Sequence, residues 1–238
     1  MTQAMETPAF SVFGTKENNT ILVPEMPITA RNNCQSGKWI IGDEEYGSKC
    51  SMTILKFSKF FGSLGQTQNT LWGQIWFVAE SGDLPQGVVM ATYIKSRSLN
   101  DFNRLVTSIQ AQGIEPATGI FVPEFSKHSG QKPDEQGILK PINYYSLKWS
   151  WTKRKDWSII KQAAAVLADN SNLARMIDLE GTQQMACLDH LAPHQIAGLI
   201  AAYTQTEITE SLAFAGKEES ALTALSEKRP VEISGRLN

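Results

Sequence analysis

Cysteine is scarce in this chain, and long apolar runs are missing. The three cysteines among 238 residues form no CxxC pair, which argues against a disulfide framework and suits a reducing compartment. No apolar run approaches the roughly 18 residues that a membrane span needs. The first ten residues, MTQAMETPAF, also lack the charged-then-apolar pattern of a signal peptide. We therefore expect a soluble, cytoplasmic protein with no membrane partner.

Charge is also low. Charged residues make up 19% of the chain and the net charge is −2, which excludes a uniformly basic protein such as a histone. The hydrophobic fraction of 42% excludes a disordered chain. The length suits one large domain or two small ones, at roughly 100 to 200 residues each.

The motifs of common enzyme classes are missing. The chain has three histidines and contains no GxGxxG, GxxxxGK[ST], HExxH or GxSxG sequence. Only Cys187, His190 and His194 have a metal-like spacing, and no second ligand pair completes a zinc site. A buried cysteine near two half-exposed histidines is the simpler interpretation. The carboxylates at 43–45 and 134–135 lie in turn-rich segments. We expect no catalytic residue, metal or cofactor, and hence no enzyme.

Aromatic residues and charge divide the chain into regions. Of the 21 aromatic residues, 17 lie between Trp39 and Trp157. Residues 30–160 carry a net charge of +4, whereas the remainder carries −6 and is rich in alanine toward its end. We expect four segments: an N-terminal extension (1–29), a β-rich domain (30–155), a helical region (156–215) and a flexible C-terminal tail (216–238).

The middle region has the composition of β-strands. Runs of β-branched and aromatic residues, separated by turn residues, predict strands over 38–41, 50–61, 72–79, 87–95, 119–125 and 142–153. The segment ESGDLPQ predicts a hairpin between the third and fourth of these, and 126–137 is expected to be a polar loop. The last strand alternates, with Tyr145, Leu147, Trp149 and Trp151 on the face expected to enter the core and Tyr144, Ser146, Lys148, Ser150 and Thr152 on the other.

Helical periodicity occurs in two places. A helix capped by Ser98 or Asn100 should end near Gly113. Beyond the strands, a helix should run from Asp156 to Asn170, with short helices over 172–180 and 183–191. A last helix should begin at Pro193, with a stripe formed by Ile196, Leu199, Ile200 and Tyr203. That stripe either packs on the core or mediates self-association.

Aromatic rings interleaved with cations are the strongest functional pattern in the β-rich region. Single-stranded nucleic acid is held by rings that stack on bases and by cations that follow the phosphates. The candidate stacking residues are Trp72, Trp76, Tyr93 and Tyr144. The candidate phosphate contacts are Lys56, Lys59, Lys95, Arg97, Lys148, Lys153 and Arg154. The competing interpretation is ordinary packing, because aromatic residues also suit half-buried strands.

The order of elements resembles an OB-fold, a small Greek-key barrel with a helix between its third and fourth strands. The hairpin WGQIWFVA…GVVMATYIK, the helix LNDFNRLVTSIQAQ, and then GIFVPEF and YYSLKWSWTK carry this resemblance. It is similar to the single-stranded-DNA-binding proteins of phages and plasmids. The resemblance implies an α+β protein, with an OB-like antiparallel β-barrel followed by an α-helical C-terminal region.

The expected function is therefore non-catalytic binding of single-stranded nucleic acid, DNA rather than RNA, by a protein of DNA replication that self-associates through its C-terminal helices. Such proteins often end in an acidic tail with an aromatic tip, whereas this chain ends EISGRLN. Recruitment of replication partners through a tail is therefore not expected. The alternative is an assembly protein, either a virion component or a subunit of a multi-protein or RNA-guided complex.

Overall fold

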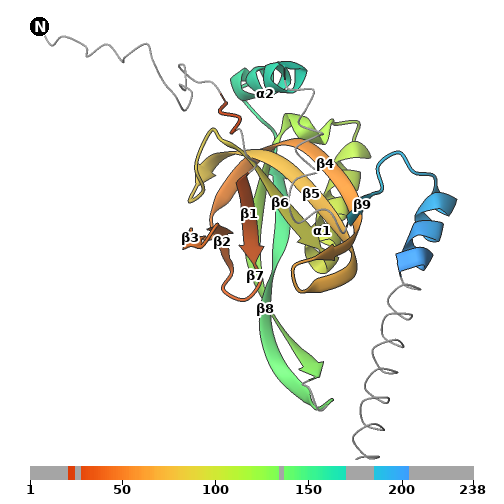
Figure 1. Cartoon of the computed structure of the whole chain (residues 1–238). Coiled ribbons are helices and arrows are strands. Elements are labelled where there is room, and N and C mark those ends of the chain that lie inside the picture. The colour runs from red at the N-terminus through yellow and green to blue at the C-terminus, as the bar shows by residue number, and fades with distance from the viewer. Residues whose placement is uncertain (1–20, 25–27, 134–136, 170–184, 204–238) are drawn as a thin grey trace, which may run out of the picture. The chain divides into compact units, whose positions relative to one another are not determined.

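The computed structural model describes residues 21–24, 28–133, 137–169 and 185–203. The chain divides into two compact units, Met1–Asp189 and His190–Asn238. Most described elements belong to the first unit (Figure 1). Its strands are β1 (Ile28–Asn33), β2 (Lys38–Ile41), β3 (Glu44–Glu45), β4 (Cys50–Leu64), β5 (Thr67–Gly82), β6 (Val89–Lys95), β7 (Ile120–Pro133), β8 (Leu139–Thr152) and β9 (Met185–Cys187). Its helices are α1 (Ser96–Gln110), the short 3-10 helix η1 (Pro116–Thr118) and α2 (Ser158–Asp169).

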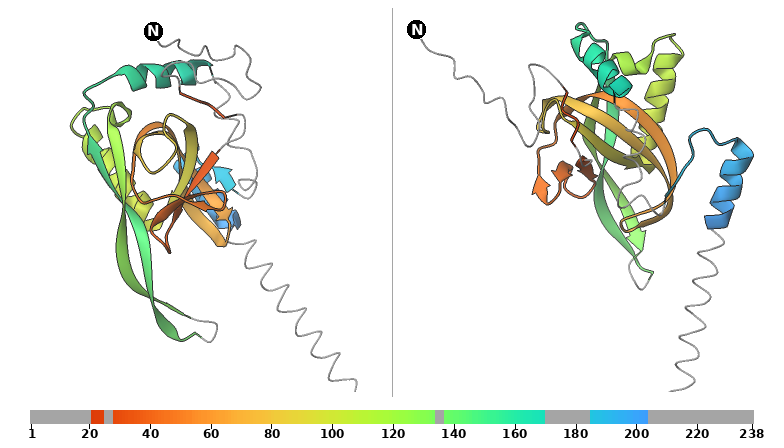
Figure 2. Two further views of the ribbon diagram at one scale, coloured as in Figure 1. Left: turned by 90° about the vertical axis from the view of Figure 1, so that its left-hand side faces the viewer. Right: turned by 45° about the horizontal axis from the view of Figure 1, so that its top comes forward.

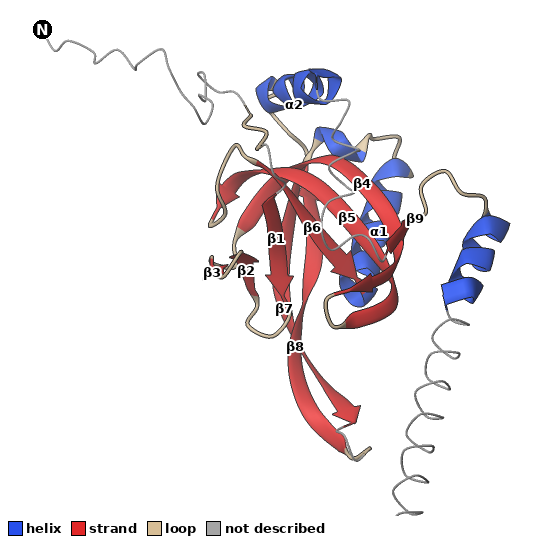
Figure 3. Ribbon diagram, in the orientation of Figure 1, coloured by secondary structure: helices blue, strands red, loops and turns tan. Residues whose placement is uncertain are grey.

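The nine strands form one large sheet in the order β3-β2-β1-β6-β5-β4-β7-β8, with β9 added to β4. Nearly all named pairs are antiparallel, and β1 with β6 is the parallel pair. Figure 3 shows this combination of one sheet and a few helices. The expected α+β class is confirmed. The two predicted hairpin strands, β5 and β6, pair from Trp72 with Lys95 to Val78 with Val89.

The structure corrects the predicted polar loop over 126–137. Residues 126–133 continue β7, which pairs with β8 from Ile120 with Thr152 to Pro133 with Leu139. The far part of this hairpin projects beyond the rest of the sheet (Figure 1). Its polar side chains have no core to enter, so hydrophobic alternation cannot reveal the strand. Backbone pairing with β8 forms it instead.

Two hydrophobic clusters lie on opposite faces of the sheet. The inner cluster packs residues of the strands, among them Trp39, Phe77 and Trp149, against Leu99 and Phe102 of α1. The outer cluster lies over β4, β5 and β6 and includes Trp72, Trp76 and Val89. Residues of α2 and β9 and the segment beginning at Ile21 complete it, namely Ile159, Ala163, Val166 and Met185 besides Ile21 itself. Figure 2 shows α2 lying over the curved sheet.

The N-terminus of α1 differs from the prediction. The helix begins at Ser96, and its N-cap residue, Lys95, makes no side-chain capping bond. Ser98 and Asn100, the predicted caps, are therefore inside the helix. Ser98 is buried and has another role, because its Oγ accepts a hydrogen bond of 2.9 Å from the Leu147 amide of β8.

The free edge of β8 is closed by three hydrogen bonds to two other segments of the chain. Besides Leu147, the Trp149 amide donates to Asp101 Oδ2 of α1 at 2.7 Å. The Tyr145 amide donates to the Cys34 carbonyl, just after β1, at 2.7 Å. An open sheet edge invites pairing with other chains. These contacts, which we call the β8 edge seal, occupy the edge and fix α1 against it.

The chain after β8 agrees with the sequence in part. The Asp156 carboxylate accepts a bond of 2.9 Å from the Ser158 amide, as expected for a residue that caps α2. The helix predicted over 183–191 is wrong, since 185–187 form β9 and pair with β4. The helix predicted over 172–180 lies outside the described residues. In the second unit, a helix over 193–203 begins at Pro193 as predicted.

We expect Ser98→Ala to destabilise the protein. The Leu147 amide would remain buried without an acceptor, which costs about 1–3 kcal/mol. The measurement is the midpoint of urea unfolding at unchanged m-value. Ser108→Ala is the matched control, because Ser108 lies on the same helix and is exposed; its effect should stay within about 0.5 kcal/mol. Equal midpoints for the two variants would contradict the role given to Ser98.

Candidate nucleic-acid interface

A basic pocket of about 480 Å³ lies between α1 and the β7–β8 hairpin. The β8 edge seal holds its two walls together, because Ser98 and Asp101 bond to β8 from the same helix face that carries the pocket residues. Helical spacing places positions 97, 100, 101 and 104 on one side of α1. The lining residues are Ser96, Arg97, Asn100, Asp101, Arg104, Ser126, His128, Leu147 and Lys148.

The charge of this pocket is positive. Arg97, Arg104 and Lys148 are exposed, whereas the lining holds one carboxylate, Asp101, which already accepts the Trp149 amide. Glu124 is the cross-strand neighbour of Lys148 and offsets part of its charge. Three cations around one hollow favour an anionic ligand such as a phosphate.

Two aromatic rings stand beside the cations. The His128 and Tyr144 rings are 5.3 Å apart at an interplanar angle of 37°, and both residues are half-buried. Arg97 Nη1 lies 3.2 Å from His128 Nδ1. Because a guanidinium can only donate, Nδ1 accepts in this contact, and the ring hydrogen is placed on Nε2. That nitrogen then donates to Ser146 Oγ at 2.8 Å, so the ring is fixed from both sides.

The predicted residues Arg97 and Lys148 thus meet at one pocket, with Tyr144 against its His128. Sequence reasoning missed His128, because it assigned the residue to a loop, and it also missed Arg104. Arg104 had a usable signal, since it lies seven residues after Arg97 on the same helix face. His128 had none, because its strand carries no hydrophobic alternation.

The predicted stacking residues Trp72 and Trp76 lie elsewhere and are buried, with 6% and 2% of their surface exposed. The Trp72 indole donates to the Gly62 carbonyl at 3.1 Å, and that of Trp76 donates to Gln74 Oε1 at 3.0 Å. Both belong to the outer cluster. In this structure, neither indole ring is accessible for stacking on a base.

Tyr93 and Lys95 share this outer face of the sheet. Lys95 Nζ lies 5.0 Å from the centroid of the Trp72 ring and donates to Thr67 Oγ1. Burial lowers the pKa of Lys95 and raises the pKa of the Tyr93 phenol. Tyr93 accepts a bond of 2.7 Å from Gln74 Nε2. Lys95 directly precedes α1, so it lies between this face and the pocket residues Ser96 and Arg97.

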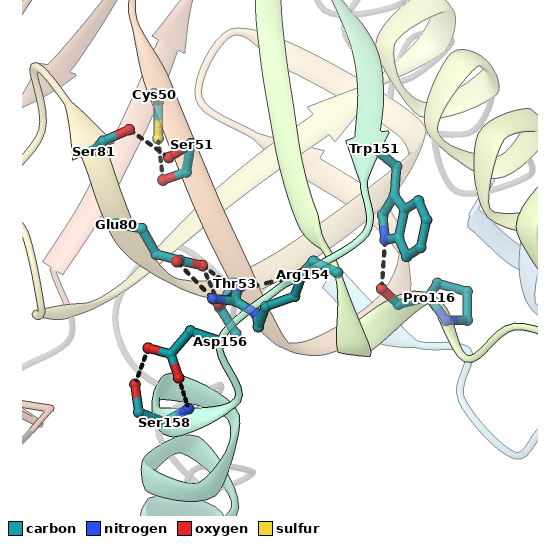
Figure 4. Close-up of polar contacts among 11 residues, drawn as sticks. Cys50, Ser51, Thr53, Glu80, Ser81, Pro116, Trp151, Arg154, Asp156 and Ser158 are labelled. Atoms are coloured by element: carbon teal, nitrogen blue, oxygen red, sulfur yellow. Dashed lines mark hydrogen bonds and ion pairs between the residues drawn. The ribbon is translucent and has the colours of Figure 1, made fainter.

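Arg154, a predicted phosphate contact, is the clearest correction. It is buried, with 7% of its surface exposed. Nη1 donates to Glu80 Oε2 at 2.8 Å, and Nη2 donates to Glu80 Oε1 and to Thr53 Oγ1. Figure 4 shows the guanidinium between these two side chains. A buried ion pair of this kind ties β8 to β4 and β5, so we assign Arg154 a structural role.

The remaining predicted cations lie away from the pocket. Lys153 is exposed and borders a second hollow, of about 690 Å³, near the start of α2. Lys56 and Lys59 lie on β4 beside β9, where the Lys59 amide donates to Asp189 Oδ1 at 3.0 Å. The structure does not bring these three residues to the pocket lining.

The cysteine–histidine spacing forms no site in the described part of the chain. Cys187, expected to be buried, is exposed, as are His190 and His194. Burial raises the pKa of the Cys187 thiol, and burial together with nearby Asp83 raises the pKa of Cys50 to about 12. These thiols are therefore protonated at neutral pH. Among the residues in the described ranges, no three metal-ligating side chains gather.

Comparisons with known proteins found no match. No protein-family model matches the sequence, and no curated protein or solved structure matches it either. Within the segments that the structure describes, no helix is long and apolar enough to cross a membrane.

We expect Arg154→Met to cost stability, because it strands the Glu80 carboxylate, whose side chain is 19% exposed. Removing one partner of a buried pair costs about 3–5 kcal/mol, so we expect about 2–4 kcal/mol for this carboxylate, which keeps some contact with solvent. The measurement is urea unfolding followed by circular dichroism. Lys153→Met, at the exposed neighbouring position, should leave the midpoint unchanged; equal losses would argue against the ion pair.

Proposed function

We propose that this protein binds single-stranded nucleic acid without catalysis, and that the α1–hairpin pocket is its phosphate-binding site. The observation that carries the proposal is the convergence of Arg97, Arg104 and Lys148 beside the His128–Tyr144 ring pair. Cations that follow a phosphate chain, next to flat rings that stack on bases, are the two requirements of a single-strand site. DNA is the preferred ligand on the resemblance to phage and plasmid single-stranded-DNA-binding proteins.

We further propose that the sheet is a variant of the OB barrel, and two observations support this. The order β4-β5-β6-α1-β7-β8 has its helix between the third and fourth strands, and β4 pairs with both β5 and β7, as in a five-stranded Greek-key barrel. The bond from the Tyr145 amide to the Cys34 carbonyl brings β8 to the end of β1. On this proposal β1 is an added strand between β6 and β8.

One surface supports the alternative function, that of an assembly protein. The far end of the β7–β8 hairpin exposes large apolar side chains, with Leu139 60% and Ile142 37% exposed. Exposed apolar residues that cluster on a projecting element are typical of protein–protein contacts. An assembly protein therefore remains the alternative, and ionic strength separates the two functions. Binding through phosphates weakens steeply with salt, whereas apolar assembly does not.

The test is a fluorescence titration with oligo-dT at two or more salt concentrations. The expected result is saturable binding whose affinity falls as salt rises. The combined variant Arg104→Ala/Lys148→Ala should bind more weakly, and its log–log salt slope should be shallower by about 1.4, since each lost phosphate contact removes about 0.7 for a single strand.

Lys49→Ala is the matched control for charge, because Lys49 is exposed at the start of β4 and is not among the pocket residues. It should keep the wild-type salt slope. An unchanged slope in the Arg104→Ala/Lys148→Ala variant, with its fold intact by circular dichroism, would exclude the pocket as the phosphate site. No binding by the wild-type protein at low salt would favour the assembly function.

We also expect Tyr144→Leu to weaken oligo-dT binding by about 5- to 150-fold, since stacking on one base contributes roughly 1–3 kcal/mol. Leucine keeps much of the apolar surface of the half-buried ring, so the fold should persist. The salt slope should stay at its wild-type value, because no cation is lost. A loss of slope rather than of affinity would show that Tyr144 acts through the neighbouring charges instead.

A further inference from the structure

The outer face of β4, β5 and β6 is unusually polar for a surface beneath a helix. Its residues form three cross-strand rows: Phe60–Trp72–Lys95, Ser58–Gln74–Tyr93 and Lys56–Trp76–Ala91. Side chains buried between a sheet and a helix are ordinarily aliphatic. Here two indoles and a phenol surround a buried glutamine, and two lysines border them.

Hydrogen bonding on this face runs mainly between its own members. Gln74, 1% exposed, donates to the Tyr93 phenol and accepts from the Trp76 indole, and Lys95 lies over the Trp72 ring. These contacts hold polar side chains of the face to one another. Ser58 is the exception, since its Oγ is fully buried and has no hydrogen-bond partner. A buried hydroxyl without a partner is unfavourable, and a ligand in place of the cover could satisfy it.

Apolar residues of α2 form part of the cover. Ile159, Ala163 and Val166 belong to the outer cluster with Trp76, whereas Leu167, at the flank of this stripe, is 38% exposed. Apolar contacts are non-directional, so they specify the position of a helix less sharply than hydrogen bonds do. Another flat apolar surface, such as a nucleobase, could replace them.

We propose that this face is a second base-binding surface, covered in part by α2 in the present structure, and that α2 and single-stranded nucleic acid compete for it. The inference rests on the proposed function and extends it. Lys95 supplies the connection, because it lies on the face and directly precedes the pocket residues Ser96 and Arg97. A strand held at the pocket can continue past Lys95 along this face toward Trp76 once α2 moves away.

Competition of this kind has a definite thermodynamic consequence. If the face is open in only a fraction of molecules, the apparent affinity for nucleic acid is reduced by that fraction. Weakening the α2 contacts must then strengthen binding, which is the opposite of what loss of an ordinary packing contact would do. Conversely, nucleic acid must loosen α2.

The first experiment compares two neighbouring residues of α2. Val166→Glu places a charge at a position that is 9% exposed. Leu167→Glu places the same charge at the next position, which is 38% exposed. Binding to a 20-nucleotide oligo-dT should tighten at least fivefold for Val166→Glu and change less than twofold for Leu167→Glu. Adding Trp76→Leu to Val166→Glu should abolish the gain. A folded Val166→Glu protein with wild-type affinity would overturn the proposal, as would a gain that survives Trp76→Leu.

The second experiment uses the wild-type protein, so it does not depend on the folding of a variant. Hydrogen–deuterium exchange of residues 158–169 is measured with and without saturating oligo-dT. Displacement predicts faster exchange in α2 on binding. Unchanged or slower exchange would overturn the proposed competition between α2 and nucleic acid, while leaving the pocket as the binding site. If the wild-type protein and the Val166→Glu variant both fail to bind oligo-dT, the proposed function itself is wrong.

Discussion

The arrangement of the first unit depends on how β8 satisfies the backbone of its outer edge. Three alternate amides, those of Tyr145, Leu147 and Trp149, find acceptors in the turn after β1 and in α1. A buried amide without an acceptor is costly, so α1 and the β1–β2 turn are held at fixed positions along the strand. The basic pocket exists because of this constraint, since Arg97 and Arg104 belong to the same helix that supplies Ser98 and Asp101.

Two surfaces with related chemistry result from this arrangement. The pocket presents cations beside a fixed ring pair, whereas the outer face presents rings beside cations beneath α2. Lys95 is the last residue of β6 and directly precedes α1. It therefore lies where the outer face ends and the pocket residues of α1 begin. The two tryptophans that composition favoured as stacking residues are buried in a cluster to which α2, β9 and Ile21 contribute apolar side chains.

Much of the fold could be predicted from sequence where local pattern and burial agree. Strands β4, β5 and β6 and the alternating half of β8 carry β-branched and aromatic residues that have one face to bury, and Asp156 marks the start of α2 correctly. The polar part of β7 could not be predicted, because a two-stranded ribbon in solvent imposes no hydrophobic period. The misplaced cap at Ser98 has a different cause, because a serine that caps a helix and a serine that acts as a buried hydrogen-bond acceptor are the same residue type.

The sequence could predict which residue types form the site, but not which residues they contact. Arg97, Tyr144 and Lys148 follow from the interleaving of rings and cations, yet the same rule also selected Arg154, which forms an ion pair with Glu80. Whether an arginine meets a phosphate or a carboxylate depends on what lies opposite it in space. Glu80 is 74 residues away in sequence, so no local pattern distinguishes the two outcomes.

The position of β1 has a consequence for biosynthesis. Among the strands that the structure describes, this one is made first, yet its parallel partner is β6, and Asn32 of β1 bonds to Thr92, 60 residues later. Its neighbouring turn bonds to β8, which is made later still. A nascent chain can pair β1 with β2 early, but β1 must wait for its parallel partner β6 and for β8, because non-local pairings wait for the intervening chain. On a translating ribosome, β1 therefore reaches its full set of native neighbours only after β8 has been made.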